Sequence, residues 1–443
     1  MKTPIADFVK NYIKSGFSRF HMPGHKGRSF LGIEKMDITE ISGADVLSEA
    51  QGIIRESEQN ASEIFKTRTT LYSTEGSTSV IYTMLSLVKK KCEGRQVIFA
   101  ARNVHKAFVY GCALCDFDVK WLMPKKFSNI LKCDITAEFL EQEIVNSDIK
   151  PVAVYITSPD YLGNISDISE ISKVCKKYDI PLLVDNAHGA YLGFLKESLH
   201  PIHHGATACC DSAHKTLPVL TGGAYLHISK DAPKEFFEKA KSRLAIFTST
   251  SPSYLTLQSL DLCNKYLAEE IKEKLDSCMK KVDDIKKYAI EKGLSILKSE
   301  PLKIVIDAKK SGYSGRKMAE MLRQNRIEPE FSDEDFVVLM ISPQNKNKDF
   351  RRLKKAFSGI ITQKEIEKED VTIPQPIVKL SPRQAVFSDF EEIDVKKAEG
   401  RICATPSVSC PPAIPIAISG EMITTDIIKL FEKYDIEKIK VVK

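Results

Sequence analysis

The sequence lacks several features that would place it in a membrane or an oxidising compartment. It has no run of about eighteen apolar residues, so no membrane-spanning helix is expected. The N-terminal stretch MKTPIADFVKNYIKSG carries charged side chains where a signal peptide has an apolar core. The 11 cysteines follow no regular spacing, which in a chain without an export signal indicates reduced thiols. We therefore expect a cytoplasmic protein.

A zinc site is also not expected. Cys112 and Cys115 form a single CxxC, but no second pair and no nearby histidine spacing completes a metal site. We interpret the two cysteines as a packing pair on one face of a helix, and we predict no metal.

The charge is close to balanced, which argues against a nucleic-acid partner. The chain has 65 basic and 59 acidic residues, and the lysines are scattered through helical stretches such as residues 265–287. At 443 residues, with 43% hydrophobic and 28% charged side chains, the sequence is typical of a globular protein too long for one core. We predict two domains, residues 1–295 and residues 296–443.

Strand and helix patterns alternate through residues 95–230, which predicts an α/β domain with a mostly parallel sheet. Residues 253–292 form one or two long helices in this interpretation. Beyond them, short strand and helix patterns predict a smaller C-terminal α+β domain.

A candidate reaction centre lies in the middle of the chain. Pro181 to Val184 is a continuous apolar run, typical of a strand buried on both faces, and Asp185 closes it. In open α/β sheets, ligands bind beyond the carboxyl ends of the strands. Lys215 follows on a turn, between Ser212, His214 and a pair of glycines. A surface lysine and a helix-capping aspartate would give the same spacing, so the pattern alone leaves two interpretations.

If the segment is a reaction centre, its residues suit a pyridoxal phosphate (PLP) site. Lys215 would form a Schiff base with the cofactor, and Asp185 would keep the pyridine nitrogen protonated. Ser212 and His214 would hydrogen-bond the phosphate. Glu75-Gly76-Ser77-Thr78 offers a second phosphate seat, because Gly76 gives backbone freedom and Ser77 and Thr78 open a helix. An ordinary helix cap is the alternative for this stretch.

These segments resemble the PLP-dependent ornithine/lysine/arginine decarboxylases, which have the aspartate aminotransferase fold. DNAHGAY and SAHKTL are similar to the DEAHGAH and S-x-HKTL segments of that family. The resemblance extends, in the same order, to further stretches of nearly the whole chain, namely HMPGHKGR (21–28), EGST (75–78), RNVHKA (102–107), STSPSYL (249–255), GRI (400–402) and CPPAIPIAISGE (410–421). It implies the short form of the family, without an N-terminal wing domain.

The resemblance implies roles for residues that spacing does not single out. His105 would stack on the PLP ring, and Ala187 is small enough to let the ring lie close. His188 would be a proton donor or orienting group near the Schiff base. Ser251 would reach the phosphate of a neighbouring subunit, which implies a homodimer or a higher homo-oligomer.

The implied reaction is decarboxylation of lysine, arginine or ornithine to a diamine or polyamine, and hence a role in polyamine biosynthesis. The distal cation of such a substrate needs a carboxylate partner, for which Asp45, Glu75 and Asp160 are candidates. Two alternatives stay open: an aminotransferase or other lyase of the same fold, and a PLP-binding homologue without turnover. Arg383 and Arg401 are the arginines that could clamp the carboxylate of a transaminase substrate.

The sequence departs from the family pattern at several positions. These are Glu75, Asn186, Tyr191, Gly222 and Cys410. They affect the choice of substrate more than the choice of cofactor, and the sequence gives no information on allosteric regulation.

Overall fold

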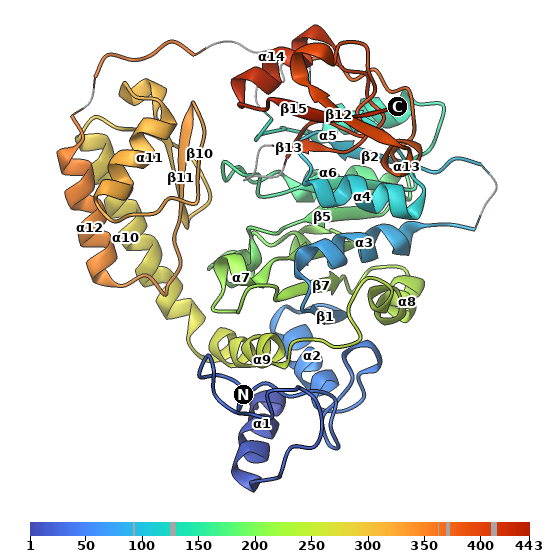
Figure 1. Ribbon diagram of the computed structural model, residues 1–443, viewed down its shortest axis with the longest axis vertical. Coiled ribbons are helices and arrows are strands. Elements are labelled where there is room, and N and C mark those ends of the chain that lie inside the picture. The colour runs from blue at the N-terminus through green and yellow to red at the C-terminus, as the bar shows by residue number, and fades with distance from the viewer. Residues whose placement is uncertain (92–93, 125–129, 362, 369–372, 409–413) are drawn as a thin grey trace. The chain divides into compact units, whose positions relative to one another are not determined.

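The computed structural model describes residues 1–91, 94–124, 130–361, 363–368, 373–408 and 414–443 (Figure 1). Cys410, one of the departures from the family pattern, lies outside the described residues. The chain divides into two compact units. The first contains Met1–Lys89 and Pro181–Glu273, and the second contains Lys90–Ile180 and Lys274–Lys443. The predicted boundary between residues 295 and 296 remains a prediction.

The first unit is built on four strands in the order β1-β7-β6-β5. The strands β5 and β6 are parallel, whereas β7 runs antiparallel to both β6 and β1. The elements of this unit are α1 (Pro4–Ser15), α2 (Ile53–Ile64), β1 (Thr69–Ser73), α3 (Gly76–Val88), β5 (Leu182–Asp185), β6 (Ala208–Asp211), α7 (Ala213–Thr216), β7 (Ala224–Ile228), α8 (Lys234–Ala245) and α9 (Tyr254–Glu269), with short 3-10 helices at Leu47–Glu49, Ala190–Phe194 and Pro201–His204.

The strands of the first unit bring several connections to one edge. Asp185 of β5 pairs with Cys210 of β6, so the two parallel strands end side by side. Asp211 pairs with Tyr225 at the start of β7, and Ser73 at the end of β1 pairs with Ala224. The segments that follow β1, β5 and β6 therefore leave the sheet at the same edge, where an α/β sheet binds its ligands.

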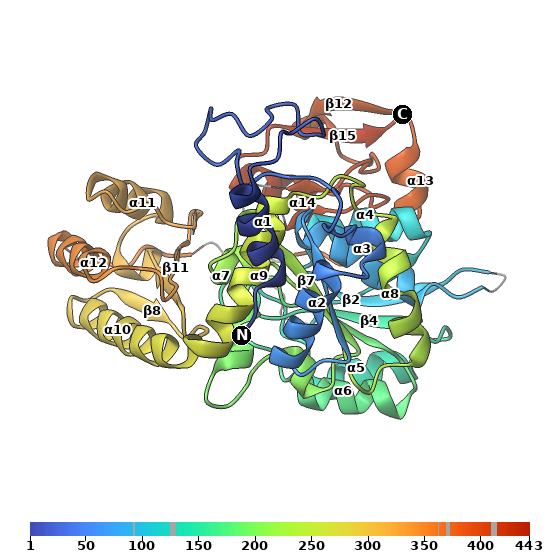
Figure 2. The same ribbon diagram turned by 90° about the horizontal axis from the view of Figure 1, so that it is seen from below.

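The helices α1, α2 and α9 pack against one another in the first unit (Figure 2). Asp261 of α9 joins them, because its carboxylate accepts hydrogen bonds from the Ile5 and Ala6 N–H groups, both at 3.0 Å, and from Ser57 Oγ at 2.6 Å. A buried carboxylate is tolerated where donors surround it.

The second unit contains three parallel strands in the order β4-β2-β3 and a separate four-stranded antiparallel sheet in the order β10-β11-β9-β8. Its elements are β2 (Val97–Ala101), α4 (Lys106–Cys115), β3 (Asp118–Leu122), α5 (Ala137–Val145), β4 (Ala153–Thr157), α6 (Ile168–Lys177), α10 (Ile271–Glu291, which begins in the first unit), β8 (Ser295–Leu297), β9 (Lys303–Asp307), α11 (Gly315–Gln324), β10 (Phe331–Ser332), β11 (Phe336–Met340), α12 (Asn347–Gly359), α13 (Pro382–Phe387), β12 (Phe390–Asp394), β13 (Ser407–Val408), β14 (Pro415–Ala417), α14 (Thr425–Lys433) and β15 (Lys438–Val442), with 3-10 helices at Lys309–Ser311 and Val395–Lys397.

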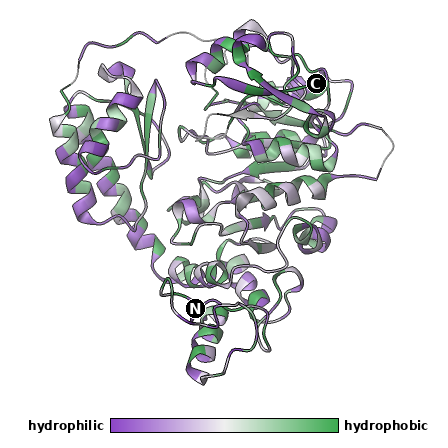
Figure 3. Ribbon diagram, in the orientation of Figure 1, coloured by the Kyte–Doolittle hydropathy of each residue, from purple (hydrophilic) through white to green (hydrophobic). Residues whose placement is uncertain are grey.

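Hydropathy explains why these segments take these forms. Figure 3 shows apolar residues gathered along the strands, and polar residues on helices such as α10 and α12. The strands β2, β5, β6, β7 and β9 are buried along their whole length, and apolar residues make up most of each strand. The prediction of an α/β fold with a mostly parallel sheet and a smaller α+β part is confirmed. Among the described residues, no helix is long and apolar enough to cross a membrane.

Arg102 connects β2 to the C-terminal segment of the second unit. Its guanidinium donates to the carbonyls of Pro415 and Ile416 at 3.0 and 2.8 Å and to Glu421 Oε2 at 3.2 Å. Arg102 and Glu421 are both buried. A planar guanidinium suits such a site because it can satisfy several acceptors at once. These hydrogen bonds hold the start of the segment that runs from β2 to His105.

Asp45 organises the chain before α2 in the first unit. The side chain is buried, and its carboxylate accepts hydrogen bonds from the N–H groups of Val46, Gln51, Gly52 and Ile54 at 2.7 to 3.1 Å. Burial alone would raise the pKa of Asp45, but the hydrogen bonds from Gln51, Gly52 and Val46 outweigh it and hold the pKa below its ordinary value.

The substitution Asp45→Asn should lower the free energy of unfolding at pH 7 by about 1 to 3 kcal/mol, because buried N–H groups lose a charged acceptor. Since the pKa is depressed in the folded state, the contribution of Asp45 is present above a pH of about 4, the unfolded value, and is lost as the pH falls through the folded value. Urea unfolding at a series of pH values should show the wild type and the variant converging in acid. The exposed Asp231→Asn serves as the control. If the free energies of unfolding of wild type and Asp45→Asn differed as much in acid as at pH 7, this account would be contradicted.

Candidate functional site

Lys215 and His188 meet at the edge of the sheet. Lys215 is exposed and lies on α7, which directly follows β6, and His188 is buried in the segment after β5. Lys215 Nζ and His188 Nε2 are 3.1 Å apart, which is hydrogen-bonding distance. The sequence predicts a turn at Lys215. The structure shows one turn of helix there, because the Leu217 N–H bonds back to the Ala213 carbonyl.

Asp185 is the last residue of β5 and is almost completely buried, with 2% of its surface exposed. Its Oδ1 accepts a hydrogen bond from the Ala187 N–H at 3.2 Å and one from Cys210 Sγ at 3.3 Å. Burial raises the pKa of the Cys210 thiol well above its ordinary value, so the thiol keeps its proton and acts as the donor. Sequence reasoning missed Cys210, because the contact depends on the pairing of Asp185 with Cys210 across two strands.

The segment after β1 forms the N-terminus of α3. Gly76 has a φ of 72°, and its N–H donates to the Gly222 carbonyl at 2.7 Å. The next residues, Ser77 and Thr78, supply the first-turn N–H groups and two hydroxyls of a 13-residue helix. Ser212 Oγ donates to Ser77 Oγ at 2.8 Å, so the predicted phosphate seats after β1 and β6 are in contact. A helix N-terminus with neighbouring hydroxyls favours an anion.

Gly222, one of the departures from the family pattern, lies where this structure leaves no room for a side chain. Its φ is 95°, and a Cβ at this position would lie 2.6 Å from the Thr74 carbonyl oxygen. The close approach of Gly222 to the segment after β1 therefore requires glycine.

His214 has one ring nitrogen already engaged. Its Nδ1 lies 3.1 Å from the Gly223 carbonyl, to which it donates. Burial lowers the pKa of His214, and the neighbouring Lys215 charge lowers it further. His214 is therefore neutral with its proton on Nδ1, and a hydrogen bond to a phosphate would require a second proton on Nε2.

Three further residues that the sequence singles out are the predicted cofactor residues His105 and Ser251 and the departure from the family pattern at Tyr191. His105 is in the second unit, where its Nδ1 caps α4 by accepting from the Ala107 N–H at 3.1 Å. Ser251 is exposed between α8 and α9, and its N–H donates to Ser249 Oγ at 3.0 Å. Tyr191 lies buried in the 3-10 helix Ala190–Phe194.

The three acids proposed for a substrate cation differ in availability. Asp45 is occupied by the N–H groups before α2. Asp160 is buried, which raises its pKa to about 6, and its two oxygens accept from the backbone and side chain of Asn164 at 2.9 and 2.8 Å. Glu75 is exposed and accepts from Thr74 Oγ1 at 2.9 Å. Glu75 is therefore the acid among the three that remains accessible to a ligand.

His200, Cys209 and Asp211 have ligand atoms within 4.8 Å of one another, as a metal site requires. Their lone pairs are engaged, however. His200 Nδ1 accepts from the Ile202 N–H at 3.3 Å, and its Nε2 lies 2.9 Å from Asp211 Oδ2. Burial raises the pKa of the Cys209 thiol, which disfavours the thiolate that binds metals. The group is a hydrogen-bonded cluster.

The residues of the first unit fit PLP. An exposed lysine beside a buried histidine suits a covalently held carbonyl group, and a buried carboxylate held by two donors suits a protonated ring nitrogen. The helix N-terminus with Ser77, Thr78 and Ser212 suits a phosphate. The α/β fold and this set of residues together define a PLP-dependent enzyme of the aspartate aminotransferase fold.

Comparison with known proteins gives the family. Residues 3–305 match the Orn/Lys/Arg decarboxylase major domain, and residues 365–436 match the Orn/Lys/Arg decarboxylase C-terminal domain. The chain belongs to the Orn/Lys/Arg decarboxylase family. The predicted family, fold class and PLP cofactor are confirmed, as is the enzyme class, a PLP-dependent amino acid decarboxylase.

The relatives that cover nearly the whole chain include two arginine decarboxylases from Bacillus species. The arginine decarboxylase of Bacillus subtilis (strain 168) is 29% identical over 98% of this chain and 94% of its own length. The arginine decarboxylase of Bacillus anthracis is 29% identical over 98% of this chain and 93% of its own. Among solved structures, the lysine decarboxylase of Francisella novicida aligns with 100% of this chain and 81% of its own, with a TM-score of 0.81 and 19% identity. Lysine decarboxylase A from Pseudomonas aeruginosa aligns with 99% of this chain and 80% of its own, with a TM-score of 0.83 and 13% identity.

Proposed function

We propose that the protein decarboxylates a basic amino acid, with arginine as the preferred substrate and agmatine as the product. The observation that carries the proposal is the contact between Lys215 Nζ and His188 Nε2 within the unit that also holds Asp185. The arginine decarboxylases that match over nearly the whole chain support the choice of arginine. This reaction belongs to polyamine biosynthesis, and we propose that it takes place in the cytoplasm.

In this proposal, Lys215 binds PLP covalently and Asp185 holds its ring nitrogen. When bound, PLP would supply an electron sink for the electron pair of the bond to the departing CO2. Asp185 is fixed for this role because the Ala187 N–H and the Cys210 thiol orient its carboxylate. His188 is placed to exchange a proton with the Lys215 amine, because the two nitrogens are 3.1 Å apart.

The phosphate would lie at the N-terminus of α3. Ser77, Thr78 and Ser212 offer hydroxyls there, Gly76 shapes the turn, and His214 donates once it is protonated. The positive end of the helix dipole adds to the attraction. The proposed roles of Ala187 against the ring and of His105 above it come from the family resemblance.

An aminotransferase is the second candidate, since it shares the fold and the cofactor. It would need an arginine for the substrate carboxylate. Arg383 donates to the Ala113 carbonyl at 3.2 Å, and Arg401 donates to the Val442 carbonyl at 2.9 Å and to Glu391 at 2.7 Å. Both arginines have structural partners in the second unit, which favours the decarboxylase.

The test is to incubate the protein and PLP with arginine, lysine or ornithine and to identify the products by mass spectrometry. We expect agmatine from arginine, in excess over cadaverine and putrescine. A keto acid without CO2 would establish the aminotransferase instead. If the protein bound PLP but formed no product from arginine, lysine or ornithine, it would be a PLP-binding homologue without turnover.

Glu75→Gln should separate recognition of the substrate cation from chemistry. If Glu75 pairs with the distal cation of the substrate, the variant should have a KM about tenfold higher and a nearly unchanged kcat. A roughly tenfold change lies between the small effect of losing an exposed ion pair and the large effect of losing a buried one. Glu235→Gln, an exposed acid on α8, is the matched control. Equal KM values for Glu75→Gln and wild type would remove Glu75 from the substrate site.

We also propose a homodimer as the smallest active unit. Large apolar side chains are exposed in the segment after α1, including Phe17, Phe20, Phe30 and Leu31, which are 71 to 96% exposed. A group of exposed apolar side chains marks a protein interface. In a dimer, Ser251 would reach the partner's phosphate, as the family resemblance implies.

The double substitution Phe20→Asp with Phe30→Asp should convert a dimer to a monomer and abolish activity, because it places charges in the apolar interface. Sedimentation velocity with an activity assay on the same samples is the measurement. Ile290→Asp, on an exposed position of α10, should remain dimeric. A fully active wild-type monomer would contradict the dimer.

A further inference from the structure

The two halves of the proposed PLP site leave the sheet on separate segments. Asp185 and His188 follow β5, and Lys215 follows β6. The last backbone hydrogen bond between the two segments runs from the Asn186 N–H to the Cys210 carbonyl at 3.0 Å. Beyond that point, side chains must hold one segment against the other.

Asn186 and Asp211 supply such a contact. Asn186 Nδ2 donates to Asp211 Oδ1 at 2.6 Å, and both side chains are fully buried. Asn186 immediately follows Asp185, and Asp211 lies four positions before Lys215. The contact therefore joins the two segments directly behind the residues proposed to hold the cofactor.

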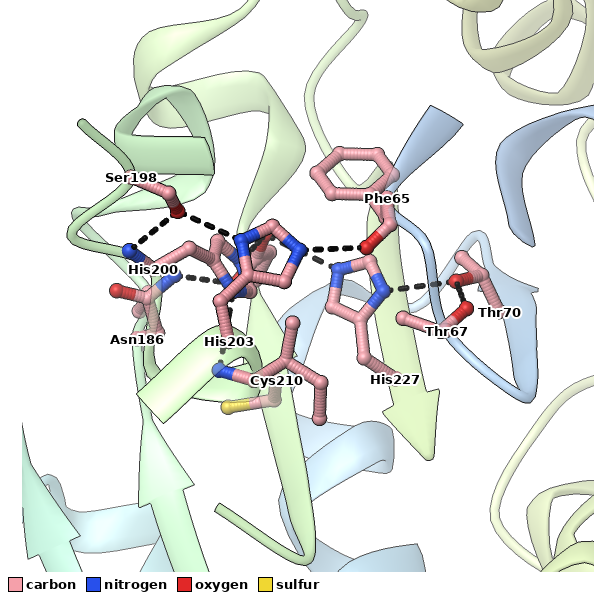
Figure 4. A network of polar contacts seen from close by, with 12 residues as sticks. Phe65, Thr67, Thr70, Asn186, Ser198, His200, His203, Cys210 and His227 are labelled. Carbon is pink, nitrogen blue, oxygen red and sulfur yellow. Dashed lines mark hydrogen bonds and ion pairs between the residues drawn. The ribbon is translucent and has the colours of Figure 1, made fainter. Parts of the chain in front are cut away.

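Two histidines contact the other carboxylate oxygen of Asp211. Figure 4 shows their rings, His200 and His227, in the polar network that also contains Asn186 and Cys210. His200 Nε2 and His227 Nε2 lie 2.9 and 3.1 Å from Asp211 Oδ2, and both rings are fully buried. Burial would raise the pKa of Asp211, but the two histidines outweigh it and hold the pKa well below its ordinary value. Asp211 is therefore an anion that accepts three hydrogen bonds.

The directions of these hydrogen bonds agree with one another. His200 Nδ1 accepts from the Ile202 N–H, so the proton of His200 is on Nε2 and points to Asp211. Burial lowers the pKa of His227, which keeps this ring neutral. Its Nε2 then donates to Asp211, and its Nδ1 accepts from Thr70 Oγ1 at 2.8 Å. The cluster of Asp211, His200 and His227 therefore carries one negative charge, on Asp211. Each N–H and O–H group named here donates to an acceptor.

The orientation of the Asn186 amide follows from that charge. An oxygen facing the Asp211 carboxylate would be repelled, so Nδ2 points to Asp211 and Oδ1 points away. Among the described residues, Asn186 Oδ1 has no hydrogen-bond partner. The side chain therefore acts through its bond to Asp211.

We propose that Asn186 and Asp211 form a positioning pair, which holds the segments after β5 and β6 in the register that the PLP site needs. The inference rests on the proposed function in that Lys215, Asp185 and His188 are the groups being positioned. Neither residue of the pair touches the cofactor in this proposal. The pair acts through the segments that carry those three groups.

The pair can be tested by exchanging its two side chains. Asn186→Asp places two carboxylates opposite each other, and a repulsion worth one pKa unit corresponds to about a tenfold change in an equilibrium constant. We expect Asn186→Asp to raise the Kd of the apoprotein for PLP about tenfold or more. Asp211→Asn should have a smaller effect, because the Asn186 amide can turn to accept from the new amide.

The double variant Asn186→Asp with Asp211→Asn should restore PLP affinity close to that of the wild type. The introduced amide can accept from His200 and His227 with its oxygen and donate to the introduced carboxylate with its nitrogen. Rescue of one substitution by the other is the signature of a pair, which a general loss of stability would not give.

Asp261→Asn is the matched control, since Asp261 is a fully buried carboxylate of the same unit that holds α1 instead of the site. It should lower Tm without changing the PLP Kd. Should Asn186→Asp fail to fold, the comparison of Asp211→Asn with the double variant decides the question.

A wild-type Kd in Asn186→Asp would overturn the proposal. So would a double variant weaker than Asp211→Asn, or an Asp261→Asn protein that loses PLP to the same extent. Because the readout is PLP affinity of the apoprotein, an error in the proposed substrate would appear in the product assay and leave this test unchanged.

Discussion

The parallel pairing of β5 with β6 is the constraint on which the site depends. It brings Asp185 next to Cys210 and makes the two strands end at the same edge. Asp185 and Lys215 are 30 residues apart in the sequence. Because the two strands end side by side, the segment with Asp185 and His188 and the segment with Lys215 are neighbours. The antiparallel strands β7 and β1 then bring the N-terminus of α3 to the same edge, so the proposed phosphate-binding and covalent ends of the cofactor site belong to one unit.

Buried carboxylates are a recurring feature of this unit, and each is surrounded by donors. Asp45 accepts backbone N–H groups, Asp185 accepts an N–H and a thiol, and Asp211 accepts an amide and two imidazoles. A charge taken out of water is tolerated only when donors replace the lost hydration. The same physical requirement therefore explains the contacts of all three carboxylates. Asp45 holds the turn before α2, Asp185 is oriented in the candidate site, and Asp211 links the segments after β5 and β6.

Much of the candidate site could be predicted because its residues belong to local patterns, and their roles stay predictions. A strand that ends in Asp185, a lysine within SAHKT and hydroxyls at a helix start are visible in short stretches of sequence. Cys210, His200, His227 and Thr70 could not be found in this way, because their contacts cross between strands and depend on register. The parallel sheet followed from apolar runs, whereas the helical turn at Lys215 and the use of Asp45 by backbone N–H groups depend on tertiary contacts.

The central claim is that Lys215 is the residue that binds PLP. Borohydride reduction of the PLP-loaded protein, followed by peptide mass spectrometry, measures this most directly. The account predicts a PLP adduct on the peptide that contains Lys215, and loss of that adduct, together with activity, in Lys215→Ala. An adduct on a different lysine, or one that persists in Lys215→Ala, would contradict it.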